Sequence, residues 1–138
     1  MSVGRVLGLD PGTRRVGVAV SDPLGITAQP HSVLDATAPD LIEQIARLAC
    51  EVGAEGLVVG LPISLDGHEG PSAVAAREFA AALGAATGLP VKLADERFTS
   101  VTAERVLSQA GLPGRRRRAV RDRVAAAVML QAYLDGGR

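Results

Sequence analysis

Three acidic positions occur where a strand is expected to end or a helix to begin. Asp10 closes the first apolar run and is followed by Pro-Gly-Thr. The adjacent pair Asp95 and Glu96 closes a later apolar run, and Asp122 opens the last helical segment. In open α/β sheets, ligands bind beyond the carboxyl ends of the strands, and carboxylate oxygens suit Mg²⁺ or Mn²⁺ better than a structural zinc ion. If the fold brings these acids together, the sequence predicts a divalent-metal site.

Each acidic position also has a structural interpretation that needs no ligand. Asp10 could belong to a plain Asp-Pro-Gly turn. The pair Asp95 and Glu96 could lie in a solvated loop before a capped helix. Asp122 could stabilise its helix by lying in the first turn, between two arginines. The metal interpretation gains weight because three such positions occur in one chain.

Basic residues surround these acids. Six of the fifteen basic residues lie between positions 115 and 123, while the formal net charge of the chain is zero. A basic block in a neutral chain predicts local contact with an anion rather than a wholly cationic binder. Such a run is usually a solvated charged segment, but near three acids it fits phosphate binding equally well. The residues that we expect to hold substrate phosphates are Thr13, Arg14, Arg97, Arg115, Arg116, Arg117 and Arg118.

The composition limits the remaining possibilities. A chain of 138 residues with 47% hydrophobic residues predicts one globular domain over residues 1–138. Aromatic residues are only 2%, which argues against a base-stacking surface. The single cysteine, Cys50, excludes a disulfide within the chain, and we expect it to be a small buried residue on a helix. His31 and His68 are not placed for acid–base chemistry. Without a signal peptide or a long apolar run, we expect no membrane association and a cytoplasmic location.

Hydrophobic periodicity predicts a mixed α/β sheet flanked by helices, with an antiparallel part first and a parallel part after it. The first two strands form a hairpin with a polar tip. Strands are predicted over Arg5–Asp10, Val16–Asp22, Ile26–Leu34, Gly56–Leu61 and Leu89–Ala94. Helices are predicted over Pro39–Val52, Ser72–Thr87, Thr99–Ala110 and Val120–Leu134, with loops at Pro62–Gly70 and Gly111–Arg118.

The chain resembles the YqgF/RuvX family, whose members are described as Holliday junction resolvases and as pre-16S ribosomal RNA nucleases. The matching segments are residues 7–22, 58–62 with 66–67 and 69–70, 95–100 and 122–133, and the resemblance extends over essentially the whole chain. The resemblance implies a ribonuclease H-like fold with a mixed five-stranded sheet. It also implies that Asp10, Glu96 and Asp122 are the catalytic residues and the ligands of two Mg²⁺ or Mn²⁺ ions, with Asp10 bridging them.

Two features of the acidic set stay open at this point. Adjacent residues of a strand point to opposite faces, so either Asp95 or Glu96 could be the second ligand, depending on where the strand ends. After the third acid this chain has Arg123, where family members often have a small or amide residue.

The resemblance implies metal-dependent hydrolysis of phosphodiester bonds, in which one ion activates a water and the other stabilises the leaving oxygen. It favours trimming of the 5′ end of pre-16S rRNA, with the small-subunit precursor as partner. The alternative is resolution of branched DNA, which would require a symmetric dimer. The sequence does not decide between monomer and homodimer.

Two functions of other classes are also consistent with the sequence. Asp-x-Gly-Thr is similar to the phosphate motif of actin-like ATPases and sugar kinases, although those proteins use two such domains. A non-catalytic RNA-binding assembly factor would leave the acids empty.

Overall fold

The computed structural model of the chain describes residues 4–63, 67–95 and 114–137, and in the last range it describes the side chains of residues 122–136. The helix predicted over Thr99–Ala110 falls outside these ranges, as do Glu96 and Arg97.

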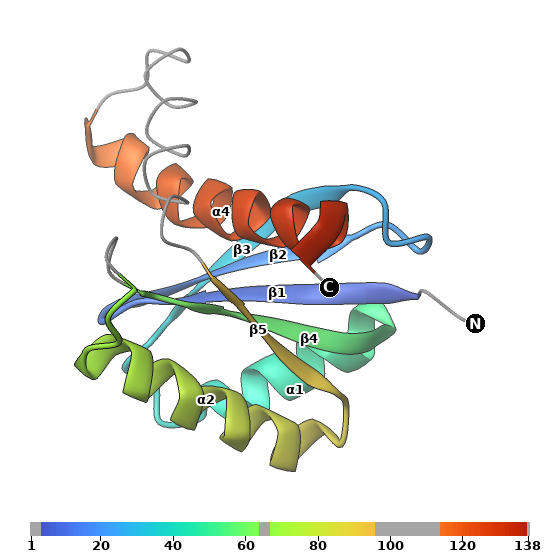
Figure 1. Cartoon of the computed structure of the whole chain (residues 1–138), viewed down its shortest axis with the longest axis horizontal. Helices are drawn as coiled ribbons and strands as arrows, with labels where there is room; N and C mark the ends of the chain where they lie inside the picture. Colours follow the sequence, from blue (N-terminus) through green and yellow to red (C-terminus); the bar gives the residue numbers. More distant parts are fainter. Residues whose placement is uncertain (1–3, 64–66, 96–113, 138) are drawn as a thin grey trace.

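One five-stranded sheet forms the centre of the molecule (Figure 1). Its strands lie in the order β3-β2-β1-β4-β5. The pairs β1–β2 and β2–β3 are antiparallel, whereas the pairs β1–β4 and β4–β5 are parallel, as the sequence predicted. The strands are β1 (Arg5–Pro11), β2 (Arg15–Ser21), β3 (Ala28–Asp35), β4 (Ala54–Leu61) and β5 (Val91–Asp95).

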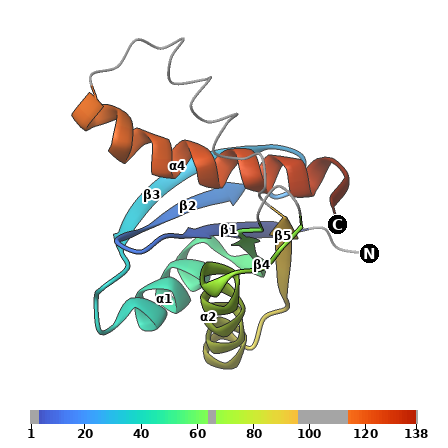
Figure 2. The same ribbon diagram turned by 60° about the vertical axis from the view of Figure 1, so that its left-hand side comes forward.

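Helices cover both faces of the sheet (Figure 2). Helices α1 (Leu41–Val52) and α2 (Pro71–Thr87) lie on one face, and each ends at a glycine in the left-handed conformation, Gly53 and Gly88. Helix α4 (Gly114–Ala132) crosses the other face and continues into the short π-helix η1 (Tyr133–Gly137). Of the described helices, none is sufficiently long and apolar to cross a membrane.

Helix α4 begins earlier than the sequence predicted. The backbone of Arg115–Arg118 is helical from Gly114 onward, so these arginines are not in a loop. The physical reason is that arginine is a good helix former, and the segment after Gly114 contains no helix breaker. The high charge of this run favoured a loop in the sequence, although charge alone does not oppose a helix.

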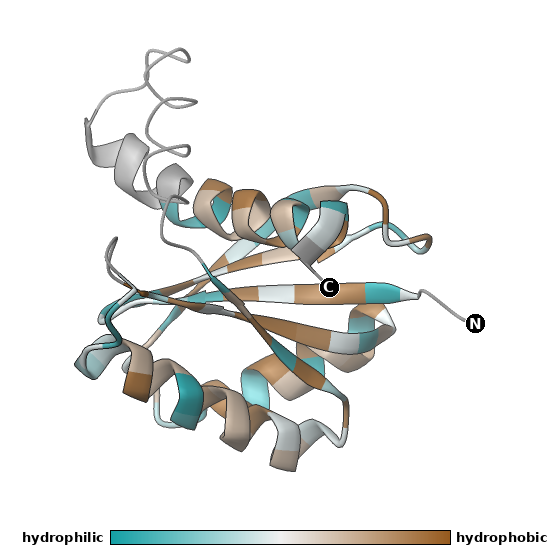
Figure 3. Ribbon diagram, viewed as in Figure 1, coloured by the Kyte–Doolittle hydropathy of each residue, from teal (hydrophilic) through white to brown (hydrophobic). Residues whose placement is uncertain are grey.

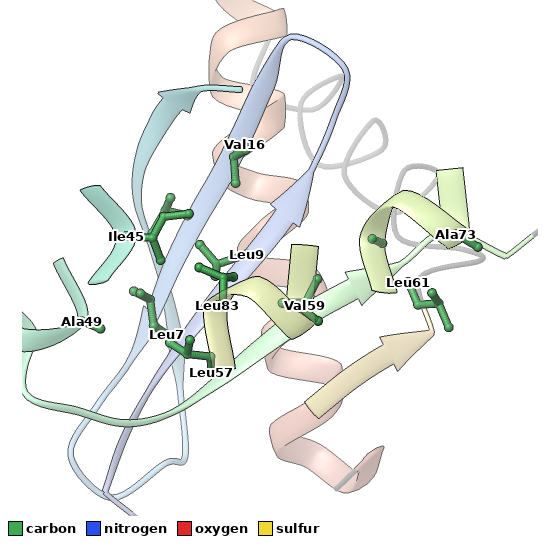
Figure 4. Close-up of a cluster of buried hydrophobic side chains, with 13 residues drawn as sticks. Leu7, Leu9, Val16, Ile45, Ala49, Leu57, Val59, Leu61, Ala73 and Leu83 are labelled. Carbon is green, nitrogen blue, oxygen red and sulfur yellow. The ribbon is translucent and has the colours of Figure 1, made fainter. Parts of the chain in front are cut away.

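The strands bury alternate residues in two different cores, because successive side chains of a strand point to opposite faces. Apolar residues occupy most of the central strands (Figure 3). Toward α1 and α2 lies the larger core, which includes Leu7, Leu9, Val16, Ile45 and Leu57 (Figure 4). Toward α4 lies a smaller core made of Ala19, Val58, Ala126, Met129 and Leu130.

Small residues on the α4 side of the sheet allow α4 to pack closely. A Cβ atom added at Gly8 would lie 3.0 Å from the Cβ of Leu130. At Gly17 the approach is closer, because an added Cβ would lie only 2.0 Å from the main-chain oxygen of Asp122. The backbone of α4 at Asp122 therefore rests directly on β2 where that strand has no side chain.

Cys50 is exposed, which corrects the expectation that it is buried. It lies on α1, but the buried positions of that helix are Ile45 and Ala49. Because successive residues of a helix are separated by about 100° around its axis, the residue after Ala49 is turned away from the core.

The contact between Gly17 and α4 makes a testable prediction. Replacing Gly17 with alanine requires α4 to move away from the sheet, so we expect the free energy of unfolding to fall by about 1–3 kcal/mol. The measurement is urea denaturation followed by circular dichroism.

Gly84→Ala is the matched control for this substitution. Gly84 lies within α2, and its added Cβ would make an ordinary 3.5 Å contact with Val91. Alanine is favoured over glycine inside helices by about 1 kcal/mol, so this variant should be at least as stable as the parent. A Gly17→Ala protein as stable as the parent would contradict the close packing of α4 on β2.

Candidate active site

Asp10 lies near the end of β1 on the face of the sheet that α4 covers. It pairs with Gly17 across the antiparallel β1–β2 ladder. Residues directly opposite each other in such a pair have side chains on the same face. A Cβ atom added at Gly17 would point at the main chain of Asp122 in α4. Asp10 therefore lies on the face that α4 covers. The flanking residue Leu9 is buried in the core on the opposite face, as the alternation requires.

The main chain of Asp122 lies against Gly17, on the same face of the sheet as Asp10. Its carbonyl lies over Gly17, and its side chain is only 23% exposed. The sequence predicted that Asp122 lies in the first turn of the last helix, but α4 begins at Gly114, about two turns earlier. The interpretation of Asp122 as a partner of the helix dipole is therefore wrong, because that interaction is confined to the first turn.

Arg15 completes the described part of this site. Its Nε donates a hydrogen bond to Oδ2 of Asp122 at 2.5 Å, and the two residues are 107 positions apart in the sequence. Arg15 begins β2, and two residues later Gly17 lies on the same face. Arg15 is not among the site residues predicted from the sequence. The period of two in Arg15, Gly17 and Ala19, opposite the buried valines, is the signal that could have placed it.

Thr13 and Arg14 form the exposed tip of the hairpin next to Asp10. The tip is closed by a hydrogen bond from the main-chain N–H of Gly12 to the carbonyl of Arg15 at 2.9 Å. The N–H of Ala36 donates to the carbonyl of Arg14, also at 2.9 Å, which ties the tip to the end of β3. The tip is thus held at the edge of the sheet where β1 ends.

Asp95 ends β5 on the face away from Asp10. It pairs with Leu61, and Leu93, two residues before it, packs in the core on the α1 and α2 side. Ala94 between them packs toward α4. Alternation therefore places Asp95 on the face opposite to Asp10. Glu96 and Arg97, the other two predicted site residues of this segment, lie outside the described residues, and the side chains of Arg115–Arg118 are likewise not described.

Comparison with known proteins identifies the family. The model of RuvX, described as Holliday junction resolvase, matches residues 4–136. The chain belongs to the RuvX family. A protein of Moorella thermoacetica is 51% identical over 133 residues, covering 95% of this chain and 94% of that protein. A protein of Syntrophomonas wolfei is 47% identical over 135 residues, covering 96% and 95%. Both are provisionally named pre-16S rRNA nuclease.

A solved structure agrees with the fold of this RuvX-family chain. RuvC of Thermus thermophilus, in complex with a Holliday junction substrate, superposes with a TM-score of 0.57 and covers 97% of this chain and 96% of that one. Its sequence is 18% identical, so the likeness concerns the fold. The predicted ribonuclease H-like fold with a mixed five-stranded sheet is confirmed.

Two other acids of this RuvX-family chain have structural partners. The carboxylate of Asp22 accepts main-chain hydrogen bonds from Thr27, Ile26 and Leu24, and these bonds lower its pKa. Glu69 accepts two hydrogen bonds from Arg77 on α2, at 2.9 and 2.8 Å, which lower the pKa of Glu69. Asp22 and Glu69 thus organise a turn and the segment before α2.

The arrangement at Asp10 and Asp122 fits a divalent cation. Two carboxylates from β1 and α4 share one face, and Asp122 already holds a positive group, the guanidinium of Arg15. Oxygen donors of this kind suit Mg²⁺ or Mn²⁺. The described residues do not include a group of three His, Cys, Asp or Glu that could hold a metal.

The ion pair between Arg15 and Asp122 can be measured in the metal-free protein. A double-mutant cycle with Arg15→Gln and Asp122→Asn should give a coupling energy of about 0.2–1 kcal/mol, which is typical of partly exposed pairs. The coupling should decrease at high salt.

The same cycle with Arg14→Gln in place of Arg15→Gln serves as the control. Arg14 precedes β2, and a coupling to Asp122 near zero is expected. Equal coupling of both arginines to Asp122 would contradict the specific contact.

Proposed function

We propose that this protein is a divalent-metal-dependent nuclease that hydrolyses phosphodiester bonds, with Asp10, Glu96 and Asp122 as catalytic residues and metal ligands. The observation that carries the proposal is the meeting of Asp10 and Asp122 on one face of the sheet, which the contact of Gly17 with α4 produces. Two Mg²⁺ or Mn²⁺ ions, when bound, would supply activation of a water and stabilisation of the leaving oxygen. Membership of the RuvX family supports the same activity.

The face of Asp95 favours Glu96 as the second acid. Asp95 lies with Leu93 on the side of α1 and α2, away from Asp10. A ligand on that side could not share an ion with Asp10 through the sheet. We therefore assign the metal-binding role in this pair to Glu96.

Basic residues beside the acids would hold the substrate. Thr13 and Arg14 are exposed at the hairpin tip next to Asp10, and Arg97 follows the second acid. Arg115, Arg116, Arg117 and Arg118 occupy the first two turns of α4, ahead of Asp122. Contacts of arginine with phosphates position a nucleic acid without reading its sequence. The neutral net charge of the chain makes such local groups necessary for binding a polyanion.

The substrate that we favour is the 5′ end of pre-16S rRNA. The support is that relatives at 51% and 47% identity, matched over nearly their full length, are named for this activity. The proposal includes the small-subunit precursor as partner and the cytoplasm as the location. The second candidate is branched DNA, which the description of the family model and the likeness to RuvC favour. Cleavage of a junction would require a symmetric dimer.

Asp10→Asn tests the activity directly. The substitution keeps the size of the side chain and removes its charge, so the fold should be retained. Because loss of groups that merely support a metal ligand costs 10–100-fold, we expect loss of a ligand to reduce cleavage by more than about a hundredfold with Mg²⁺ or Mn²⁺. Asp95→Asn, on the opposite face, is the control and should cleave like the parent.

Both variants should be assayed on a precursor RNA and on a four-way junction. Cleavage of the RNA alone is the expected result, and cleavage of the junction alone would favour the second candidate. An Asp10→Asn protein that cleaves as fast as the parent would refute the proposed function.

A further inference from the structure

The guanidinium of Arg15 contacts one oxygen of the Asp122 carboxylate, a group that the proposed function assigns to a metal. Its Nε lies 2.5 Å from Oδ2 of Asp122, and the side chains of Arg15 and Asp122 are 42% and 23% exposed. A guanidinium at this oxygen competes with an ion for the same negative charge. A metal that binds Asp122 must therefore displace Arg15 or share the carboxylate with it.

We propose that Arg15 is a positioning residue that exchanges with the divalent ion. In the metal-free protein it holds the carboxylate of Asp122 in place. Once an ion has taken Asp122, the released guanidinium binds a phosphate of the nucleic acid. This inference rests on the proposed function, because it takes Asp122 to be a metal ligand.

The position of Arg15 permits both roles. Arg15 and Gly17 lie two residues apart on one face of β2, and Gly17 is the direct partner of Asp10. Arg15 is therefore a diagonal neighbour of Asp10, at a separation of about 7–8 Å that a long side chain can span. Thr13 and Arg14, the two residues before Arg15 in the chain, lie at the exposed tip. The same guanidinium can thus reach the acids or turn toward a phosphate held at the tip.

The exchange requires movement of side chains only. The main chain of Asp122 is fixed by its contact with Gly17, and the main chain of Arg15 is fixed by its hydrogen bond from Gly12. Without an ion, Asp10 and Asp122 bring two negative charges to one face, and the guanidinium offsets their repulsion. A divalent ion offers more positive charge to the same oxygens. It can therefore replace the guanidinium, since partly exposed ion pairs are weak.

The exchange couples metal binding to substrate binding. A phosphate-binding group becomes available only when the ion is bound, so each ligand should favour the other, as linkage requires. Arg14 lies next to Arg15 at the hairpin tip, and the main-chain bond from Ala36 holds the tip there. Substitution of Arg14 removes the same charge as substitution of Arg15 but does not release Asp122. Arg14→Gln is therefore a matched control.

The test is a titration of the protein with Mn²⁺ in the absence of nucleic acid. The electron paramagnetic resonance signal reports the concentration of free Mn²⁺. Arg15→Gln should bind Mn²⁺ roughly 1.5- to fivefold more tightly than the parent, the factor expected when a partly exposed competing ion pair is removed. Arg15→Lys keeps the competing charge and should lie closer to the parent. Arg14→Gln should leave the affinity unchanged.

The second measurement is the salt dependence of RNA binding, made by fluorescence anisotropy with Ca²⁺ in place of the active ion. With Ca²⁺ bound, Arg15→Gln should reduce the slope of log K against log salt by about 1, the value of one phosphate contact. Without Ca²⁺ the slope should not change.

The outcomes separate this inference from the proposed function. If the parent binds Mn²⁺ in a manner that Asp10→Asn weakens, but Arg15→Gln binds it no more tightly, the exchange is wrong and the metal site stands. If Arg14→Gln raises the affinity for Mn²⁺ as much as Arg15→Gln does, the exchange is also wrong. The increase would then come from the lower positive charge of the protein and not from the release of Asp122. If the parent shows no Mn²⁺ binding that depends on Asp10, the proposed function and the exchange both fail.

Discussion

The contact between the main chain of Asp122 and the bare backbone of Gly17 is the constraint on which the site depends. An added Cβ at Gly17 would lie 2.0 Å from the carbonyl oxygen of Asp122, so any larger residue would push α4 off the sheet. Because Gly17 is also the ladder partner of Asp10, this close approach places two acids that are distant in the sequence on the same face of the sheet. The packing of α4 and the geometry of the candidate metal centre therefore have the same cause.

The two faces of the sheet have different roles: one holds the larger apolar core, and the other carries the candidate site. The face toward α1 and α2 holds the larger apolar core, which includes Leu9 of β1 and Ile45 of α1. The face toward α4 holds a smaller core, which includes Ala19 and Ala126, and carries the charged groups at the edge where β1 ends. Arg15 belongs to this second face and is the described cation that contacts Asp122. Replacing it changes the charge balance of the site without disturbing the main core.

Much of the fold could be predicted from the sequence, because the periodicity of apolar residues is local information. The hairpin, the strand ending at Leu61 and the helices ending at Gly53 and Gly88 all carry such signals. The predicted start of α4 is wrong because the charge of the arginine run indicates a loop, although arginine also favours a helix. The meeting of Asp10 with Asp122, the role of Arg15 and the exposure of Cys50 depend on tertiary packing, which no local pattern contains. The resemblance to a family implied the acidic set, but not the contact of Gly17 with α4 that places Asp10 and Asp122 on one face.

The most direct test of this account is anomalous diffraction from crystals of the protein soaked in Mn²⁺. We expect an anomalous peak at bonding distance from carboxylate oxygens of both Asp10 and Asp122, with the guanidinium of Arg15 moved away from Oδ2 of Asp122. Saturating Mn²⁺ without a peak at these two residues, or with the peak at other residues while the ion pair of Arg15 stays intact, would contradict the account.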